Sequence, residues 1–158
     1  MYTITSFDHK IMVTIIAGSR HITNYNLLCA VIEESGFDIT QIICGCAEGV
    51  DRLGLIYAIT HQIPHRMFPA DWLNISHQDA VVRYRKTPNF DCIKYDAKAG
   101  HRRNYRMAIV ADVLIALWDG ESKGTKDMIS LAKQRGLAYY VLNLKTMKID
   151  RNLTIFGV

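Results

Sequence analysis

Short apolar runs alternate along the chain with segments whose apolar residues recur at helical spacing. Residues 12–17 form a β-branched run, MVTIIA, which ends at Gly18 and predicts a buried strand. Residues 24–36 follow with apolar positions three and four apart. Asn24 is a suitable N-cap and Gly36 a suitable C-terminal stop, so this segment predicts a helix.

The same two patterns continue as far as the C-terminus. They predict a strand at 41–44, a helix at 52–61, a strand at 65–68, a helix at 102–111, a strand at 112–118, a helix at 125–135 and a strand at 138–144. A short edge hairpin is expected at 147–156. Strands that alternate with helices indicate a parallel sheet with crossover helices. We therefore expect one domain over residues 1–158, with a three-layer, Rossmann-like α/β fold.

Each of four predicted strands is followed by a loop rich in Gly, Ser, Asp or Thr. The loops read GSRHIT at 18–23, GCAEGVD at 45–51, PADW at 69–72 and WDGESKGT at 118–125. In open α/β sheets, ligands bind outside the carboxyl ends of the strands, near the point where the strand order reverses. The four loops are therefore expected to gather around one ligand site.

The loop at 118–125 has the composition of a phosphate site. Gly124 allows close backbone approach, and the amides of Thr125 and Lys126 are expected to point outward where a helix begins at Thr125. The Ser122 hydroxyl is a further donor, and Arg103 supplies positive charge. The alternative is that Ser122 or Thr125 only caps the helix.

The loop at 45–51 contains two glycines that permit tight turns and close approach to a ligand, Gly45 and Gly49. A helix is expected to start near Val50 and to direct its free amides at an anion. Asp51 is unusual in an anion site. It either caps this helix or holds a ribose hydroxyl.

Positive charge is concentrated in one part of the chain. The 158 residues carry a net charge of +4, yet the segment from Arg83 to Arg106 holds eight Lys or Arg against only Asp91 and Asp96. Such a block favours an anionic partner, although a solvated surface is the alternative. No apolar run is long enough to cross a membrane. The N-terminal MYTITSFDHK does not resemble an export signal, so we expect a cytoplasmic protein with reduced cysteines.

No metal or cofactor is expected. The histidines do not have the spacing of a ligand set, and CGC at 44–46 is too close for a usual zinc clip and has no second pair. His101, beside Arg102 and Arg103, is instead a candidate contact to phosphate.

Two segments carry a resemblance to known families. GCAEGVDRLGLIYA, at 45–58, resembles the glycine loop of the DNA-processing protein A family, and residues 103–129 resemble the LOG family of lysine-decarboxylase-like phosphoribohydrolases. Both families belong to the SLOG superfamily of Rossmann-like nucleotide binders. The order GSR, GVD, PADW, AG…RN and WDG.S.GT is most similar to its YspA-like branch. The resemblance covers residues 13 to about 142 and implies nucleotide binding.

The resemblance to the LOG family extends to binding residues but not to its known catalytic residue. Arg103 falls on the family's active-site Arg, Asn104 on the Lys that follows it, and Gly124-Thr125 on the Gly-Thr that holds phosphate. The catalytic Glu would fall at position 128, which is Met128 here. A carboxylate at that place would stabilise positive charge on the ribose, which Met128 cannot do. The resemblance therefore implies ligand binding without the family's catalysis.

Three nearby carboxylates remain as possible substitutes, and catalytic residues are left unassigned. They are Asp119, Glu121 and Asp127. Asp127 is one residue from the required position and is expected to face about 100° away on the helix.

Residues 73–97 are a long, irregular insertion relative to the families that the chain resembles. A functional role is expected, either as a lid over the pocket or as an oligomer contact. Tyr84, Phe90 and Tyr95 either stack on a base or pack into a small core of the insertion itself.

The sequence thus predicts a protein that binds a nucleotide or nucleotide-derived signal, of the ADP-ribose type or cyclic, as a sensor or sequestering protein and as a homo-oligomer. The alternatives are a nucleoside 5′-monophosphate phosphoribohydrolase or related N-glycosidase, and a module for single-stranded DNA. The expected ligand-binding residues are Gly18, Ser19, Arg20, Gly45, Ala47, Gly49, Val50, Asp51, Asp71, Trp72, Arg103, Asn104, Asp119, Gly120, Ser122, Gly124, Thr125 and Lys126.

Overall fold

The computed structural model describes residues 10–155. The ends of the predicted domain, 1–9 and 156–158, lie outside the described residues. The same holds for most of the N-terminal MYTITSFDHK and for residue 156 of the predicted edge hairpin. Within the described residues, no helix is long and apolar enough to span a membrane.

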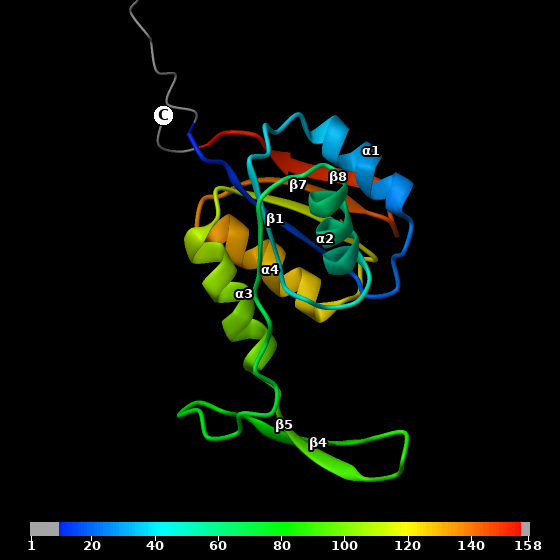
Figure 1. Ribbon diagram of the computed structural model, residues 1–158, viewed down its shortest axis with the longest axis vertical. Coiled ribbons are helices and arrows are strands. Elements are labelled where there is room, and N and C mark those ends of the chain that lie inside the picture. The colour runs from blue at the N-terminus through cyan, green and yellow to red at the C-terminus, as the bar shows by residue number, and fades with distance from the viewer. Residues whose placement is uncertain (1–9, 156–158) are drawn as a thin grey trace, which may run out of the picture.

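A six-stranded sheet forms the centre of the molecule, with strand order β3-β2-β1-β6-β7-β8 (Figure 1). All neighbouring strands in this order are parallel except β7 and β8, which are antiparallel. The strands are β1 (Val13–Gly18), β2 (Gln41–Cys44), β3 (His65–Met67), β6 (Val113–Trp118), β7 (Ala138–Asn143) and β8 (Lys148–Asn152). The predicted parallel Rossmann-like sheet is confirmed, and β8 supplies the expected edge hairpin.

Helices cover both faces of the sheet (Figure 1). They are α1 (Tyr25–Ser35), α2 (Val50–Thr60), α3 (Ala99–Val110) and α4 (Lys123–Gln134). Asn24 caps α1 by accepting from the Leu27 amide at 3.0 Å, and Gly36 follows α1 with a φ of 69°. Both ends of α1 therefore form as its flanking residues predict.

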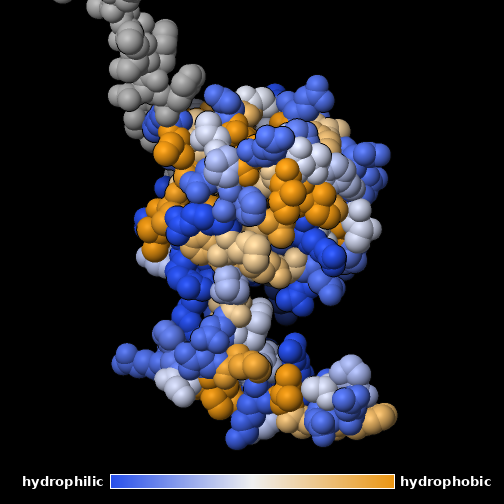
Figure 2. All heavy atoms as spheres, in the orientation of Figure 1, coloured by the Kyte–Doolittle hydropathy of each residue, from blue (hydrophilic) through white to orange (hydrophobic). Residues whose placement is uncertain are grey.

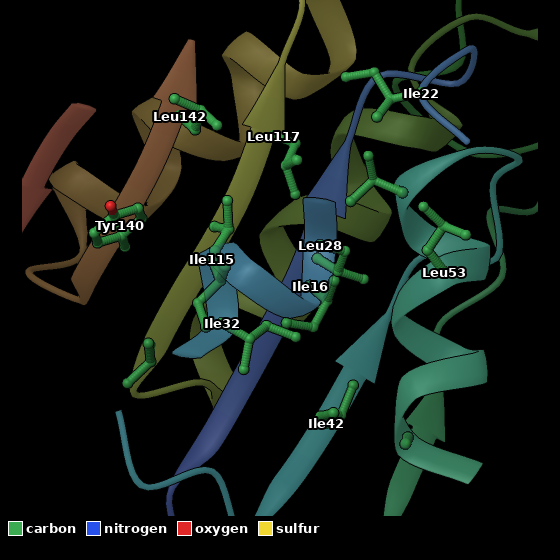
Figure 3. Packing of buried hydrophobic residues seen from close by; sticks show 14 of the residues in the cluster. Ile16, Ile22, Leu28, Ile32, Ile42, Leu53, Ile115, Leu117, Tyr140 and Leu142 are labelled. Carbon is green, nitrogen blue, oxygen red and sulfur yellow. The ribbon is translucent and has the colours of Figure 1, made fainter. Parts of the chain in front are cut away.

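Alternate residues of the strands pack into two separate hydrophobic cores, one on each face of the sheet. Ile16, Ile115 and Tyr140 are wholly buried against Leu28 and other residues of α1 and α2 (Figure 3). On the opposite face, the next residues along the same strands pack against α3 and α4. This period of two explains why apolar runs buried on both faces predicted the strands correctly.

The insertion at 73–97 was expected to be irregular, but part of it has regular secondary structure. It contains an antiparallel hairpin of β4 (Val82–Lys86) and β5 (Cys92–Asp96), which projects beyond the N-terminal end of α3 (Figure 1). Every residue of β4 is exposed. The strand has no buried face, and so neither side of its sequence, VRYRK, is apolar throughout, as the buried side of a core strand would be.

Three helices begin earlier than their apolar patterns indicate: α2, which starts at Val50 as its preceding loop had suggested, and the two that follow it. The helix predicted from residue 102 starts at Ala99, and the one predicted from Thr125 starts at Lys123, with Ser122 as its N-cap. The first turn of α4 is polar, so its start carries no apolar periodicity. This shift of two residues changes which amides are free at the site.

A buried carboxylate, Asp96, fixes the base of the hairpin. It accepts hydrogen bonds from the Val81 amide at 2.9 Å, the Lys98 amide at 3.0 Å and the Arg102 guanidinium of α3. Burial favours the neutral acid, but these hydrogen bonds outweigh it and lower the pKa of Asp96 to about 2. The hairpin is thus tied to the main body through an ionised side chain.

Candidate functional site

The centre of the sheet contains a topological switch point. From β1 the chain continues toward β2 and β3, whereas β6 leads to β7 and β8 on the other side. A cavity of about 410 Å³ lies at the carboxyl ends of β1 and β6 and is lined by residues of the loops after both strands, including Gly18 and Ser122–Thr125. This position is where doubly wound α/β folds bind ligands. We call it the switch cavity.

Hydrogen bonds hold the loops after β1 and β6 side by side. The Asp119 amide donates to the Ser19 hydroxyl at 3.1 Å, and the Ser19 amide donates to the Leu117 carbonyl at 3.1 Å. A side chain at Gly18 would overlap the Leu117 carbonyl and Val50. Gly18 is therefore needed for the close approach of β1 to β6 and α2.

Arg103 is the principal charged group in the wall of the switch cavity. It is buried, with only 8% of its surface exposed, and its guanidinium donates to the Gly45 carbonyl and, at 2.9 Å, to Asn104 Oδ1. Burial lowers the pKa of Arg103, Asp51 opposes this effect and Arg20 adds to it. Arg103 remains positively charged, because the ordinary pKa of arginine is above 12.

Gly45 has a structural role that the sequence did not indicate. A Cβ at this position would overlap the Arg103 guanidinium. The missing side chain therefore makes room for Arg103, and Gly45 also lines the second cavity described below.

Asp51 does not cap α2, whose N-cap is Gly49. The buried Asp51 carboxylate accepts from the Ala47 amide at 3.3 Å and lies 3.9 Å from an Arg103 guanidinium nitrogen. Burial raises its pKa, against the opposing effect of Arg103. Asp51 thus braces the loop at 45–49 and partly balances Arg103.

The N-terminus of α4 forms another part of the cavity wall. The Ser122 hydroxyl accepts from the Thr125 amide at 3.5 Å, and the Ser122 carbonyl accepts from the Lys126 amide at 3.0 Å. The amides predicted to bind phosphate are therefore used within the helix. The earlier start of α4 leaves the Lys123 and Gly124 amides as its free donors.

Gly124 is open to the switch cavity. It lines the cavity, and a Cβ built on it would have no neighbour within 4 Å. A side chain here would enter open space at the cavity without disturbing the packing of the protein.

Asp127 was expected to face away, but it lies in the cavity wall beside Met128. Its carboxylate accepts from Asn104 Nδ2 at 2.8 Å and contacts His101 Nδ1 at 2.6 Å. Met128 is 1% exposed and belongs to the core beneath α4. The cavity is wide enough to contact two successive residues of the helix, although their side chains point about 100° apart. The prediction had assumed that only one helical face reaches the site.

Other predicted site residues shape the loops rather than line the cavity. The Asp119 carboxylate accepts from the Glu121 and Ser122 amides at 2.9 and 2.7 Å. Burial opposes its ionisation, but these hydrogen bonds outweigh it and lower its pKa. Gly120 makes the turn with a φ of 83°, and Val50 is wholly buried. Gly49 and Lys126 are likewise not among the residues that line the cavity.

The last two residues of the PADW loop line different cavities. Trp72 lines the switch cavity, whereas Asp71 lines a separate hollow with His77 and Arg102. Asp71 and Trp72 are consecutive, and their side chains diverge as the chain leaves the sheet.

A second cavity, of about 670 Å³, adjoins the first and shares Arg20, Ala47, Trp72, Ala97 and Arg103 with it. Three residues of the β4–β5 hairpin complete its wall: Arg83, Arg85 and Tyr95. We call this space the hairpin cavity. Arg83 and Arg85 were not among the predicted site residues, although the basic block had indicated an anionic partner.

Metal ligands are not grouped in the described part of the chain: no cluster of three or more His, Cys, Asp or Glu side chains is placed to hold a metal ion.

Comparison with known proteins supports the fold. The chain resembles the crystal structure of DNA processing protein A (DprA) from Streptococcus pneumoniae, with a TM-score of 0.59 and 14% sequence identity. The likeness covers 87% of this chain and 53% of that structure, so the chain spans about half the length of that protein. The sequence matches no protein-family model and no curated protein. A likeness at this identity establishes a shared Rossmann-like fold.

Proposed function

We propose that the protein binds a nucleotide or nucleotide-derived small molecule in the switch cavity, as a sensor or sequestering protein. One observation carries this proposal: the buried Arg103 and the N-terminus of α4, with Gly124 open to the space, line the same cavity. A guanidinium and free helix amides converging on one space favour an anion such as phosphate.

The charge balance around Arg103 supports an additional anionic partner. Its nearest carboxylate, Asp51, is 3.9 Å away, which is beyond a direct charged hydrogen bond. Burying a cation is costly unless it is paired and hydrogen-bonded. A bound phosphate would supply the close contact that Asp51 does not make.

The remainder of the cavity suits a nucleoside. Its volume of about 410 Å³ lies within the usual range for small-molecule sites, and Trp72 offers an aromatic surface at its rim. The SLOG-like motifs and the shared fold with DNA processing protein A favour the same ligand class. Membership of the YspA-like branch is part of this proposal.

The proposal does not include cleavage of a glycosidic bond. Met128 occupies the position of the expected carboxylate, and the Asp127 carboxylate is engaged by Asn104 and His101. A single-stranded nucleic acid is the second candidate ligand. It is favoured by the exposed basic residues of the hairpin, Arg83 to Lys86, and by the likeness to a DNA processing protein.

Self-association is also proposed. On the hairpin, Tyr84 is 63% exposed and Phe90 is 88% exposed, so neither packs into a core of the insertion. A second copy of the chain would bury them. Sedimentation velocity should detect a dimer that the Phe90→Ser variant weakens. A wild-type protein that stays monomeric at high concentration would contradict the proposed self-association.

Calorimetric titration separates the candidate ligands. AMP, ADP-ribose and a 5′-phosphorylated oligonucleotide are titrated into the full chain at two salt concentrations. The proposal expects saturable one-to-one binding of AMP or ADP-ribose. Binding of the oligonucleotide alone, with affinity that falls steeply with salt, would favour the nucleic-acid alternative.

A further inference from the structure

We propose that the β4–β5 hairpin supplies a second anion subsite, so that the ligand is a nucleoside carrying phosphates at two separated positions. This inference rests on the proposed function, because the first phosphate is the one at α4. The observation that points to it is the hairpin cavity, which continues directly from the switch cavity past Trp72. In Figure 2 the hairpin forms a separate lobe joined to the main body by a narrow neck.

Strand register places the basic residues of the hairpin on one face. Arg83 lies opposite Tyr95, and Arg85 lies opposite Ile93. Residues two apart on a strand point to the same side. Arg83, Arg85 and Tyr95 therefore share the face that lines the hairpin cavity.

The opposite face of the hairpin is also basic but does not contribute to the cavity. Tyr84 lies opposite Lys94, whose ammonium group is 5.8 Å from the centre of the Tyr84 ring, and Lys86 lies opposite Cys92. The two faces differ in position but have similar charge. They provide a matched pair for experiments.

The hairpin cavity has an excess of positive charge. Four arginines line it, Arg20, Arg83, Arg85 and Arg103, against the single carboxylate of Glu48. Among the described residues, three of these arginines take part in no ion pair: Arg20, Arg83 and Arg85. By contrast, Arg102, which does not line this cavity, forms ion pairs with both Asp79 and Asp96. Converging like charges repel one another, and a bound anion relieves that repulsion.

An aromatic pair lies between the two anion sites. The rings of Trp72 and Tyr95 meet edge to face, with centroids 6.4 Å apart and planes at 62°. Trp72 packs over α3, where a Cβ on Gly100 would be 2.8 Å from its ring. Since Trp72 lines both cavities, a base between the two phosphates would contact an aromatic surface.

The hairpin is held in position before any ligand binds. The Asp96 amide donates to the Trp72 carbonyl at 2.8 Å, and the Ala97 amide donates to the Val81 carbonyl at 2.9 Å. The contacts between Asp96 and α3 described above add to these bonds. A subsite fixed in this way avoids much of the entropy cost of ordering a loop upon binding.

Two separated anion subsites favour a nucleoside with one phosphate on each side of the ribose over a nucleoside with a diphosphate on one side. The first places one phosphate at α4, the base near Trp72 and the other phosphate at Arg83 and Arg85. Such a unit occurs as a free nucleoside 3′,5′-bisphosphate, within a dinucleotide and at the end of an oligonucleotide.

The test is calorimetric titration of the full chain with AMP, ADP and adenosine 3′,5′-bisphosphate. Wild type should bind the bisphosphate about ten-fold or more tightly than AMP, since one charged hydrogen bond is enough for that ratio. The double variant Arg83→Ala/Arg85→Ala should lose this preference and keep its affinity for AMP. The control Lys86→Ala/Lys94→Ala removes the same charge from the opposite face and should keep the preference.

The possible failures are distinguishable. Equal affinity for AMP and the bisphosphate, an equal gain with ADP, or an equal loss in the lysine control would overturn the second subsite while leaving the proposed function intact. Binding of none of the three would contradict the proposed function itself, and the subsite with it. Titration with pApA and a 5′-phosphorylated decanucleotide identifies the source: affinity that stops rising at the dinucleotide indicates a small molecule, and affinity that rises with length indicates a nucleic acid.

Discussion

The Arg103 guanidinium lies 3.9 Å from the Asp51 carboxylate, and both side chains are buried in the wall of one cavity. Gly45 leaves the space that Arg103 occupies, and the Gly45 carbonyl accepts its hydrogen bond. The loop after β2 and the helix α3, which are far apart in sequence, are thereby joined at the candidate phosphate site.

Substitution of Asp51 tests the charge balance of this pair. Asp51→Asn should lower the free energy of unfolding by about 1–3 kcal/mol in phosphate-free buffer, because Arg103 loses its buried counter-charge. Added phosphate should then raise the melting temperature more than it does in wild type, since the anion replaces the missing carboxylate. Differential scanning calorimetry measures both effects.

The control for that variant is Asp150→Asn. Asp150 pairs with Lys133 at 2.5 Å on the surface, with both side chains largely exposed, and such pairs are worth about 0–1 kcal/mol. It should change neither stability nor the response to phosphate by much. A similar phosphate response in both variants would contradict a site at Arg103.

A side chain at Gly124 should separate binding from stability. Gly124→Ala should stabilise the protein slightly, by up to about 0.5–1 kcal/mol, because glycine is a poor helix former. Gly124→Leu should lower the affinity for AMP more than Gly124→Ala, because the larger group fills the cavity. Affinity that is unchanged in a stable Gly124→Leu protein would exclude this wall as the phosphate site.

Acid should loosen the hairpin. The pKa of Asp96 is about 2, below its ordinary value of 3.8, so its stabilising contribution is complete above pH 3.8. It is lost as the pH falls toward 2, where the carboxylate becomes protonated in the folded protein. Hydrogen exchange at Val81 and Lys98 should therefore increase over this range.

Asp96→Asn is the matching variant for the acid experiment. It removes the titrating group, so the two amides should exchange faster already at neutral pH and lose most of their dependence on pH between 4 and 2. Exchange in wild type that is constant across this interval would contradict the role of Asp96.

Release of base from AMP is not expected. Met128 cannot stabilise positive charge on the ribose, and electrostatic stabilisers of this kind are commonly worth about 10²-fold or more in rate. Chromatography after long incubation with AMP should detect no adenine above the uncatalysed background. Detectable turnover that is lost in Asp127→Asn would identify Asp127 as the carboxylate that acts in place of the expected residue.

The fold was predictable from sequence because its strands are buried on both faces and its helices have clear ends. Asn24, Gly36 and Gly136 mark helix boundaries through their own conformations, and the structure uses all three. The hairpin was not predictable, because β4 is exposed on both sides and is held by polar contacts at its base.

The site was predictable only in outline. Consecutive polar loops located the switch cavity, and Arg103 and Gly124 lie in it as expected. The contacts of Gly45, Asp51 and Asp127 join segments that are 23 to 58 residues apart, which no local pattern encodes. A two-residue error in the start of α4 was enough to select amides that hydrogen-bond to Ser122 within the helix.

The most direct test of the central claim is the affinity of the Arg103→Ala variant for AMP, measured by calorimetry beside wild type. Arg106→Ala is the control, because Arg106 lies one turn further along α3, donates to the Pro69 carbonyl and does not line the switch cavity. Circular dichroism confirms that each variant is folded. A loss of about ten-fold or more in Arg103→Ala, with Arg106→Ala unchanged, is the result expected of a phosphate bound by Arg103. Equal affinity in wild type and a folded Arg103→Ala protein would contradict it.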